Sequence, residues 1–185
     1  MHDPRLCAKP VGSSSDRARQ FKRGLLGYGT SSTRKEGQMI SGCVVSIIDG
    51  DTLVILESGE VQDKVRLAGI DAPEHNQDFG QSSKQNLARL IFGKNVWCVW
   101  RKTDRYGRTV GVIYLGGQDI NLEQIKSGLA WHYKEYEKEQ DLADRKAYSS
   151  AEEDARAKHL QIWSIRNPTP PWEFRHQRGR ERSAE

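Results

Sequence analysis

An Asp-Gly pair at residues 49–50 lies between two apolar, β-branched runs, GCVVSII (42–48) and DTLVILE (51–57). An Asp-Gly pair in this setting is the strongest short-range signal for a β-hairpin, because both turn positions tolerate the positive φ angles that the tight turn needs. The pair therefore predicts two antiparallel strands and assigns this part of the chain to an antiparallel sheet.

The rest of the central sequence predicts three more strands and three helices. The strands are expected at 61–70, 94–102 and 109–115, and the helices at 79–92, 121–129 and 139–163. Asn121 is expected to cap the second helix, and alanines four residues apart in the third (Ala143, Ala147, Ala151 and Ala155) predict a narrow stripe suited to close packing. A small antiparallel sheet best avoids exposed edges by closing into a barrel. We predict a mainly β fold with α-helices (α+β), a five-stranded oligonucleotide/oligosaccharide-binding (OB) barrel with about three helices packed on it.

The chain divides into three parts by composition and charge. Residues 1–40 carry eight Lys/Arg and three Asp/Glu and are predicted to be a basic, disordered segment. Residues 41–165 form the predicted domain, with a net charge of −3, and 166–185 are a predicted Pro/Arg-rich tail. The basic tails could hold a polyanion or could simply be solvated.

The sequence offers no apolar run near the ~20 residues of a membrane helix, and its N-terminus lacks the apolar stretch of a secretory signal. We therefore expect no membrane partner and, by default, a cytoplasmic protein. Nothing in the sequence indicates an oligomer, so a monomer is expected.

Three cysteines, Cys7, Cys43 and Cys98, show no CxxC spacing. This pattern argues against a zinc site and against a disulfide framework. Cys43 and Cys98 lie in apolar runs and are interpreted as small buried hydrophobic residues, although one bridge between them is possible.

Polar residues that could take part in catalysis or binding fall in three clusters. Asp51 follows the turn, Arg66, Asp71 and Glu74 lie in VRLAGIDAPE (65–74), and the third cluster is DRYGR (104–108). Each has a plain alternative, since a turn acid, a solvent-facing arginine or a basic hairpin tip would explain it. Together, three carboxylates could hold a hard cation through oxygen ligands, and arginines could bind phosphate. The set suits phosphodiester hydrolysis.

The order of these motifs resembles the staphylococcal nuclease (thermonuclease) family. The similar stretches are IIDGDTL (47–53), VRLAGIDAPE (65–74), DRYGRTVGVIYL (104–115), GLAW (128–131) and QIWS (161–164). The resemblance covers roughly residues 40–165. It implies an OB barrel and a Ca²⁺-dependent endonuclease that cleaves DNA and RNA with little sequence preference, cutting on the 5′-oxygen side to leave 3′-phosphate ends. It also implies that export is common, since family members are often secreted or periplasmic.

The resemblance also implies roles for individual residues. Asp51 and Asp71 match the calcium carboxylates and the Ala72 carbonyl matches a backbone ligand, although the family's type member has another side chain there. Glu74 matches the residue that activates or orients the attacking water. Arg66 and Arg108 match the residues that bind the scissile phosphate, whereas Arg105, Tyr106 and Tyr133 match substrate-binding positions.

The sequence departs from the family pattern after Glu74, where HNQDFG (75–80) is shorter and lacks the type member's lysines. His75 is interpreted as a loop residue. The alternative function is a catalytically inactive nucleic-acid or protein-binding module of the same fold. Such a module is expected to have lost acids or arginines that this chain retains, so the sequence favours an enzyme.

Overall fold

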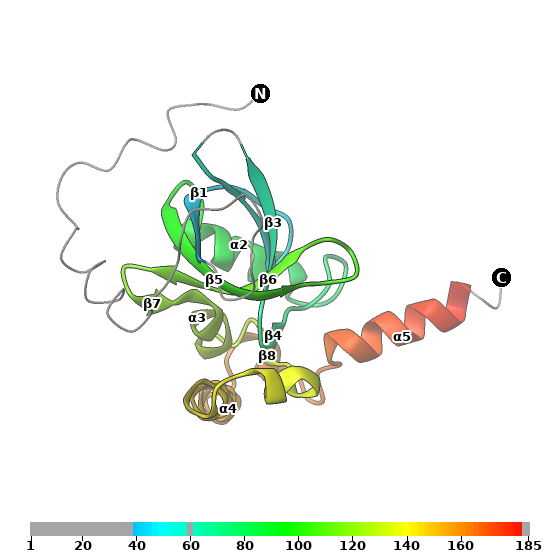
Figure 1. The fold of residues 1–185 in the computed structure, drawn as a ribbon. Helices are drawn as coiled ribbons and strands as arrows, with labels where there is room; N and C mark the ends of the chain where they lie inside the picture. Colours follow the sequence, from blue (N-terminus) through cyan, green and yellow to red (C-terminus); the bar gives the residue numbers. More distant parts are fainter. Residues whose placement is uncertain (1–38, 59–60, 183–185) are drawn as a thin grey trace.

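A closed five-stranded barrel forms the centre of the protein. The computed structural model describes residues 39–58 and 61–182. The barrel strands are β1 (Met39–Ile47), β2 (Thr52–Leu56), β3 (Gln62–Leu67), β5 (Asn95–Thr103) and β6 (Thr109–Leu115). Antiparallel pairings run in the order β3-β2-β1-β5-β6, and a parallel pairing between β3 and β6 closes the ring (Figure 1). The predicted fold class is confirmed.

The barrel closes because its strands alternate apolar and polar residues with the two-residue period of a β-strand. The inward positions are completely buried, among them Leu53 and Ile55 of β2, Val65 of β3 and Ile113 of β6. The Asp-Gly turn joins β1 to β2, and the two strands pair with the register Ile47↔Leu53.

The described residues outside the barrel form four α-helices. They are α2 (Gly80–Ile91), α3 (Ile120–Lys126), α4 (Leu142–Ala157) and α5 (Pro171–Arg182), with 3-10 turns η1 (Lys134–Glu139) and η2 (Gln161–Ser164). The predicted single helix over 139–163 is therefore wrong: η1 precedes α4, and η2 follows it.

Three short strands complete the topology. β7 (Gln118–Asp119) extends the main sheet beside β6. β4 (Ile70–Asp71) and β8 (Trp131–His132) form a separate two-stranded sheet, in which Asp71 pairs with Trp131. This small sheet fixes the position of Asp71, because a paired strand leaves its backbone little freedom.

The turn that carries Asp51 is held against the helices by buried polar groups. Gln124 of α3 donates to the Gly50 carbonyl at 2.7 Å, and Ser83 of α2 packs beside the same glycine. A Cβ atom at residue 50 would lie 2.0 Å from Ser83 Oγ and 2.7 Å from Ala72 Cβ, so only glycine fits. The turn is thus locked to α2, α3 and the loop after β4.

Two details of the helices differ from the sequence predictions. Asp119, and not Asn121, caps α3, since its carboxylate accepts from the Leu122 amide at 2.9 Å. In α4 the buried face contains Tyr148, Ala151, Glu152 and Ala155. A purely alanine stripe is therefore wrong, because the large Tyr148 fills the space at the barrel.

The predicted end segments lie partly outside the described residues. Of the predicted disordered segment 1–40, only the last two residues are described, and they begin β1. Within the predicted tail 166–185, residues Pro171–Arg182 form α5, so ordered structure continues past Pro168. Cys98 is a free, buried thiol, so it forms no bridge with Cys43. Across the described parts of the chain, no helix is long and apolar enough to span a membrane.

Candidate active site

A cavity of about 1000 Å³ opens beside β3 and the loop after β4. Its lining includes every residue that the sequence analysis assigned to the site: Asp51, Arg66, Asp71, Ala72, Glu74, Arg105, Tyr106, Arg108 and Tyr133. These residues come from the β1–β2 turn, β3, β4 and the loop after it, the β5–β6 loop and the segment after β8. The fold therefore brings together side chains that are separated by more than 80 positions in the sequence.

Two carboxylates lie at the base of this cavity. Asp51 is 6% exposed and Asp71 is fully buried. The Asp51 carboxylate accepts hydrogen bonds from the Ala72 amide at 2.8 Å and from Thr52 Oγ1 at 3.0 Å. These bonds hold Asp51 in one orientation, directed at the start of the loop that follows Asp71.

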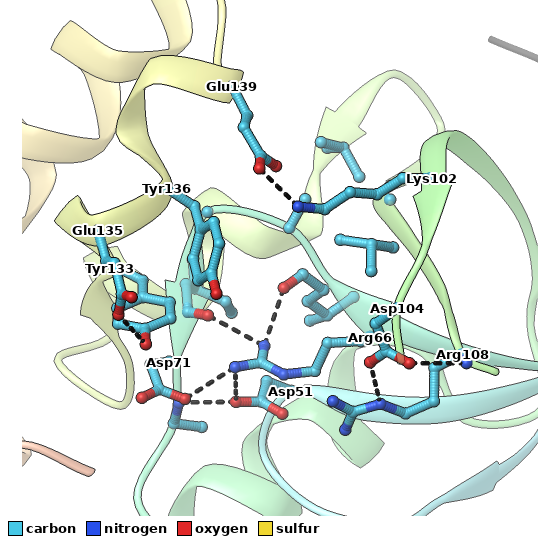
Figure 2. A pocket seen from close by; sticks show the side chains of 18 of the residues that line it. Asp51, Arg66, Asp71, Lys102, Asp104, Arg108, Tyr133, Glu135, Tyr136 and Glu139 are labelled. Atoms are coloured by element: carbon cyan, nitrogen blue, oxygen red, sulfur yellow. Dashed lines mark hydrogen bonds and ion pairs between the residues drawn. The ribbon is translucent and has the colours of Figure 1, made fainter. Parts of the chain in front are cut away.

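Arg66 connects the two carboxylates (Figure 2). Its Nη2 atom lies 2.7 Å from Asp71 Oδ1 and 3.1 Å from Asp51 Oδ2. Its Nη1 atom donates to the carbonyls of Leu67 and Ile70 at 2.9 and 3.0 Å. An arginine held by four acceptors is not a freely solvated surface residue. The alternative interpretation of Arg66 as a solvent-facing arginine is therefore wrong.

The carboxylates strongly affect one another's protonation. Burial raises the pKa of Asp71 above its usual value, while the hydrogen bond from Arg175 and the charge of Arg66 oppose that rise. Burial, followed by the nearby charge of Asp51, raises the pKa of Asp49 to about 7. Asp49 also lines the cavity, although the sequence analysis explained it as a turn residue. Burial is the main cause of both raised pKa values, so negative charge on these carboxyls needs a positive partner to be stabilised.

Glu74 is the most accessible of the three predicted acids, with 37% of its side chain exposed. Its backbone is fixed by a turn in which the Gln77 amide donates to the Glu74 carbonyl at 2.9 Å. Gly80 packs directly on that carbonyl, and a Cβ atom there would approach it to 2.0 Å. The short loop 75–80 is therefore compact, and it directs Glu74 toward the cavity.

The β5–β6 loop supplies the basic side of the cavity. Arg108 Nε donates to Asp104 Oδ2 at 2.7 Å, which orients the guanidinium without occupying its terminal nitrogens. Burial opposes ionisation of Asp104, but hydrogen bonds from Arg108 and Tyr106 outweigh it and hold the pKa of this carboxyl below its usual value. Tyr106 is 67% exposed, and the Arg105 guanidinium lies 4.8 Å from its ring centre.

Tyr133 stands on the other side of the cavity. Its hydroxyl donates to Glu135 Oε2 at 2.6 Å, and burial together with this acid raises its pKa. Its ring stacks on Trp172 of α5, with centroids 5.4 Å apart and planes 20° apart. One flat face of the Tyr133 ring is therefore covered, and Trp172 is the aromatic group packed on that face.

Arg175 of α5 is a site residue that the sequence analysis missed. Its Nη2 atom lies 2.8 Å from Asp71 Oδ2, and its Nη1 atom lies 2.8 Å from Glu74 Oε1. It lies 104 positions from Asp71 in the chain, in a segment without a motif. The basic charge of the segment was the one sequence signal that favoured contact with an anionic group.

The donor atoms suit a hard divalent cation. Asp51, Asp71 and Glu74 offer carboxylate oxygens, and Ala72 offers a nearby backbone carbonyl. The single nitrogen Arg66 Nη2 touches both Asp51 and Asp71, so both carboxylates already converge on positive charge. Over the ranges described, no three His, Cys, Asp or Glu residues form a ready-made metal cluster. The acids as arranged are instead bridged by Arg66 and Arg175.

The structure combines a small closed barrel with clustered carboxylates that face guanidinium groups, and guanidinium groups are suited to phosphate oxygens. Comparison with known proteins identifies the class of protein. Residues 64–165 match the family described as staphylococcal nuclease homologue, so the chain belongs to the staphylococcal nuclease family.

Several relatives are similar over most of their own length. The chain is 46% identical over 134 residues to an uncharacterised endonuclease of Haemophilus influenzae, covering 72% of each chain. It is 42% identical over 143 residues to a micrococcal nuclease of Shigella flexneri, covering 72% of this chain and 79% of the relative. An uncharacterised endonuclease of Escherichia coli is 35% identical over 140 residues, covering 75% of this chain and 87% of the relative.

Proposed function

We propose that this protein is a Ca²⁺-dependent endonuclease that hydrolyses phosphodiester bonds of DNA and RNA with little sequence preference. Family membership and the relatives' names support nuclease chemistry. The observation that carries the proposal is the convergence of Asp51, Asp71, Glu74, Arg66 and Arg108 on one cavity. An inactive binding module would have no use for this complete set of acids and arginines.

Asp51, Asp71 and the Ala72 carbonyl are the groups that would hold the calcium ion. A bound divalent cation supplies charge that stabilises the phosphate as negative charge builds on it. The buried setting of both carboxylates strengthens their attraction for a cation, because few waters screen them. Thr52 and the Ala72 amide keep Asp51 directed into the site.

Glu74 is the residue that would accept a proton from the attacking water or orient it. It is the only one of the three acids with substantial exposure, so a water molecule can reach it from the cavity. A carboxylate within hydrogen-bond distance of the nucleophile typically raises the rate by about 10²- to 10⁴-fold.

Arg66 and Arg108 would bind the non-bridging oxygens of the scissile phosphate. A planar guanidinium forms two parallel hydrogen bonds to a phosphate, and the interaction strengthens as the transition state gains charge. Arg105 and Tyr106, on the exposed part of the β5–β6 loop, would contact the neighbouring nucleotide. Attack that releases the 5′ oxygen leaves a 3′-phosphate on the product.

The direct test is digestion of supercoiled plasmid and of RNA by the purified protein at millimolar calcium and in excess chelator. We expect cleavage of both substrates with calcium and none with chelator, while circular dichroism stays unchanged. Products should accept further nucleotides at their 3′ ends only after phosphatase treatment. Unchanged digestion in chelator would refute the calcium assignment.

A further inference from the structure

The first half of the C-terminal helix α5 lies at the candidate active site. In Figure 1 it begins near β4 and β8 and runs outward from the body of the protein. Three of its residues, Trp172, Arg175 and His176, line the cavity together with Asp71 and Glu74. A segment that contributes to the cavity wall can limit what enters it.

Arg175 binds the acids that are proposed to work on the substrate. It donates from Nη2 to Asp71 Oδ2 at 2.8 Å, and from Nη1 to Glu74 Oε1 at 2.8 Å and Asp71 Oδ1 at 3.3 Å. Arg66 also donates to Asp71 Oδ1, at 2.7 Å. Both carboxylate oxygens of Asp71 are therefore engaged by guanidinium groups.

Contacts before and after Arg175 in the sequence fasten α5 and the residues that lead into it. Trp172 stacks on Tyr133 and meets the ring of Trp131 edge-on, with centroids 5.6 Å apart. Just before the helix, Gln77 Nε2 donates to the Thr169 carbonyl at 2.6 Å. Arg178 donates to Asn76 Oδ1 at 3.1 Å. The helix is thus fastened to the loop after Glu74 as well as to the aromatic side of the cavity.

A guanidinium on Asp71 and a divalent cation on the same carboxylate oppose each other, and the same guanidinium also holds Glu74. The two positive groups would compete for the same oxygens and would repel at short range. The ring contact has a similar effect, because Trp172 covers the face of Tyr133 that an aromatic base would need. Docked α5 therefore opposes both the cation and the nucleotide.

We propose that α5 is an autoinhibitory segment, in which Arg175 occupies the Asp71 and Glu74 carboxylates and Trp172 covers Tyr133 until calcium and nucleic acid displace the helix. This inference rests on the proposed nuclease function. Removing the Arg175 contacts should increase the fraction of molecules that can bind calcium, and the apparent calcium affinity should rise in proportion to that fraction.

Isothermal titration calorimetry of the full chain with calcium chloride tests the competition without relying on activity. Arg175→Ala is expected to bind calcium at least about tenfold more tightly than the wild-type protein. Arg180→Ala removes the same charge from an exposed position of the same helix and is the matched control. It should bind calcium as the wild type does.

Hydrogen exchange of α5 in the wild-type protein gives a second measurement that needs no variant. A helix of about 12 residues is marginal in water once it leaves its docking surface. Amides of residues 173–180 should therefore exchange faster in saturating calcium than in chelator, whereas those of β2 should not change.

The outcomes separate the two proposals. Equal calcium affinity of wild type and Arg175→Ala, with unchanged exchange of α5, would overturn autoinhibition and leave the nuclease proposal intact. Absence of calcium binding in both proteins would overturn both proposals. Tighter binding by Arg175→Ala but not by Arg180→Ala, or calcium-dependent exposure of α5, supports autoinhibition.

Discussion

Two regions line the same cavity but are held in different ways. The acidic wall, which comprises Asp51, Asp71 and Glu74 with Arg66, lies largely within the body of the protein. Arg66 alone contacts two carboxylates and two carbonyls. The basic loop, residues 104–108, is organised mainly by its own Asp104, which accepts from the Tyr106 and Arg108 amides at 2.9 and 3.0 Å.

The difference separates two tasks. Groups that must bind a cation or act on the reacting atoms need fixed positions, since misplacement by about 1 Å can reduce the rate 10²-fold. Groups that contact a flexible chain of nucleotides gain from adaptability. We therefore expect substitutions in the acidic wall to affect turnover, calcium binding and stability, and substitutions of Arg105 or Tyr106 in the basic loop to affect mainly substrate affinity. Arg108 is the exception in that loop, because it is proposed to bind the scissile phosphate and its loss should also lower turnover.

The largest expected effect is that of Glu74→Gln. Loss of the carboxylate that handles the attacking water should lower kcat at saturating calcium by about 10²- to 10⁴-fold. Oligonucleotide affinity, measured by fluorescence anisotropy, should change little. An equal loss of turnover and affinity would instead indicate that Glu74 maintains the structure of the site.

Arg66→Ala should combine loss of activity with loss of stability. It removes the partner of two buried carboxylates, and leaving buried charge uncompensated costs about 3–5 kcal/mol. Urea unfolding should show this decrease in the free energy of unfolding. Arg66→Lys is the comparison variant, since it keeps the charge but cannot reach all four acceptors. Unchanged stability of Arg66→Ala would contradict the expectation that the acidic wall contributes to the stability of the fold.

Thr52→Val tests how firmly the acidic wall is held. The threonine is buried and donates to Asp51 Oδ1 at 3.0 Å, and valine has nearly the same shape. Loss of a hydrogen bond that orients a ligand typically weakens metal binding by about 10- to 100-fold. Calorimetry should show weaker calcium binding, with kcat preserved once calcium is saturating. Unaltered affinity would mean that the Ala72 amide alone suffices to fix Asp51.

Tyr106→Ala should have the smallest effect. The ring is 67% exposed, so unfolding free energy should change by no more than about 0.5 kcal/mol. If the ring stacks on a base, its loss should raise KM by about tenfold or less. A kcat that falls while KM stays constant would place Tyr106 with the acidic wall and remove the distinction between the regions.

The barrel could be predicted from the sequence because its strands bury one face each and alternate clearly. Strands β4, β7 and β8 could not, since each has two residues and shows no period. The cap of α3 was assigned to Asn121, yet that side chain is buried and bonds to Ala68, Gly111 and Ile113. Local propensity does not reveal which of two adjacent polar residues the tertiary structure will bury.

The site was predicted unevenly for a similar reason. The motif residues were found from short segments whose order resembles a known family. Their geometry, such as Arg66 between Asp51 and Asp71, depends on strand pairing that only the fold supplies. Asp49 and Arg175 were missed, since a turn acid and a basic tail have ordinary local explanations.

The parallel pairing of β3 with β6 joins Arg66 to Val110, 44 residues further along the chain. A growing polypeptide therefore cannot assemble this seam until β6 has emerged from the ribosome. Pairings between distant segments also slow folding, because a long loop must be ordered before the contact forms. Nascent chains that end before β6 cannot build the complete barrel, so assembly of the intact cleft is a late event in biosynthesis.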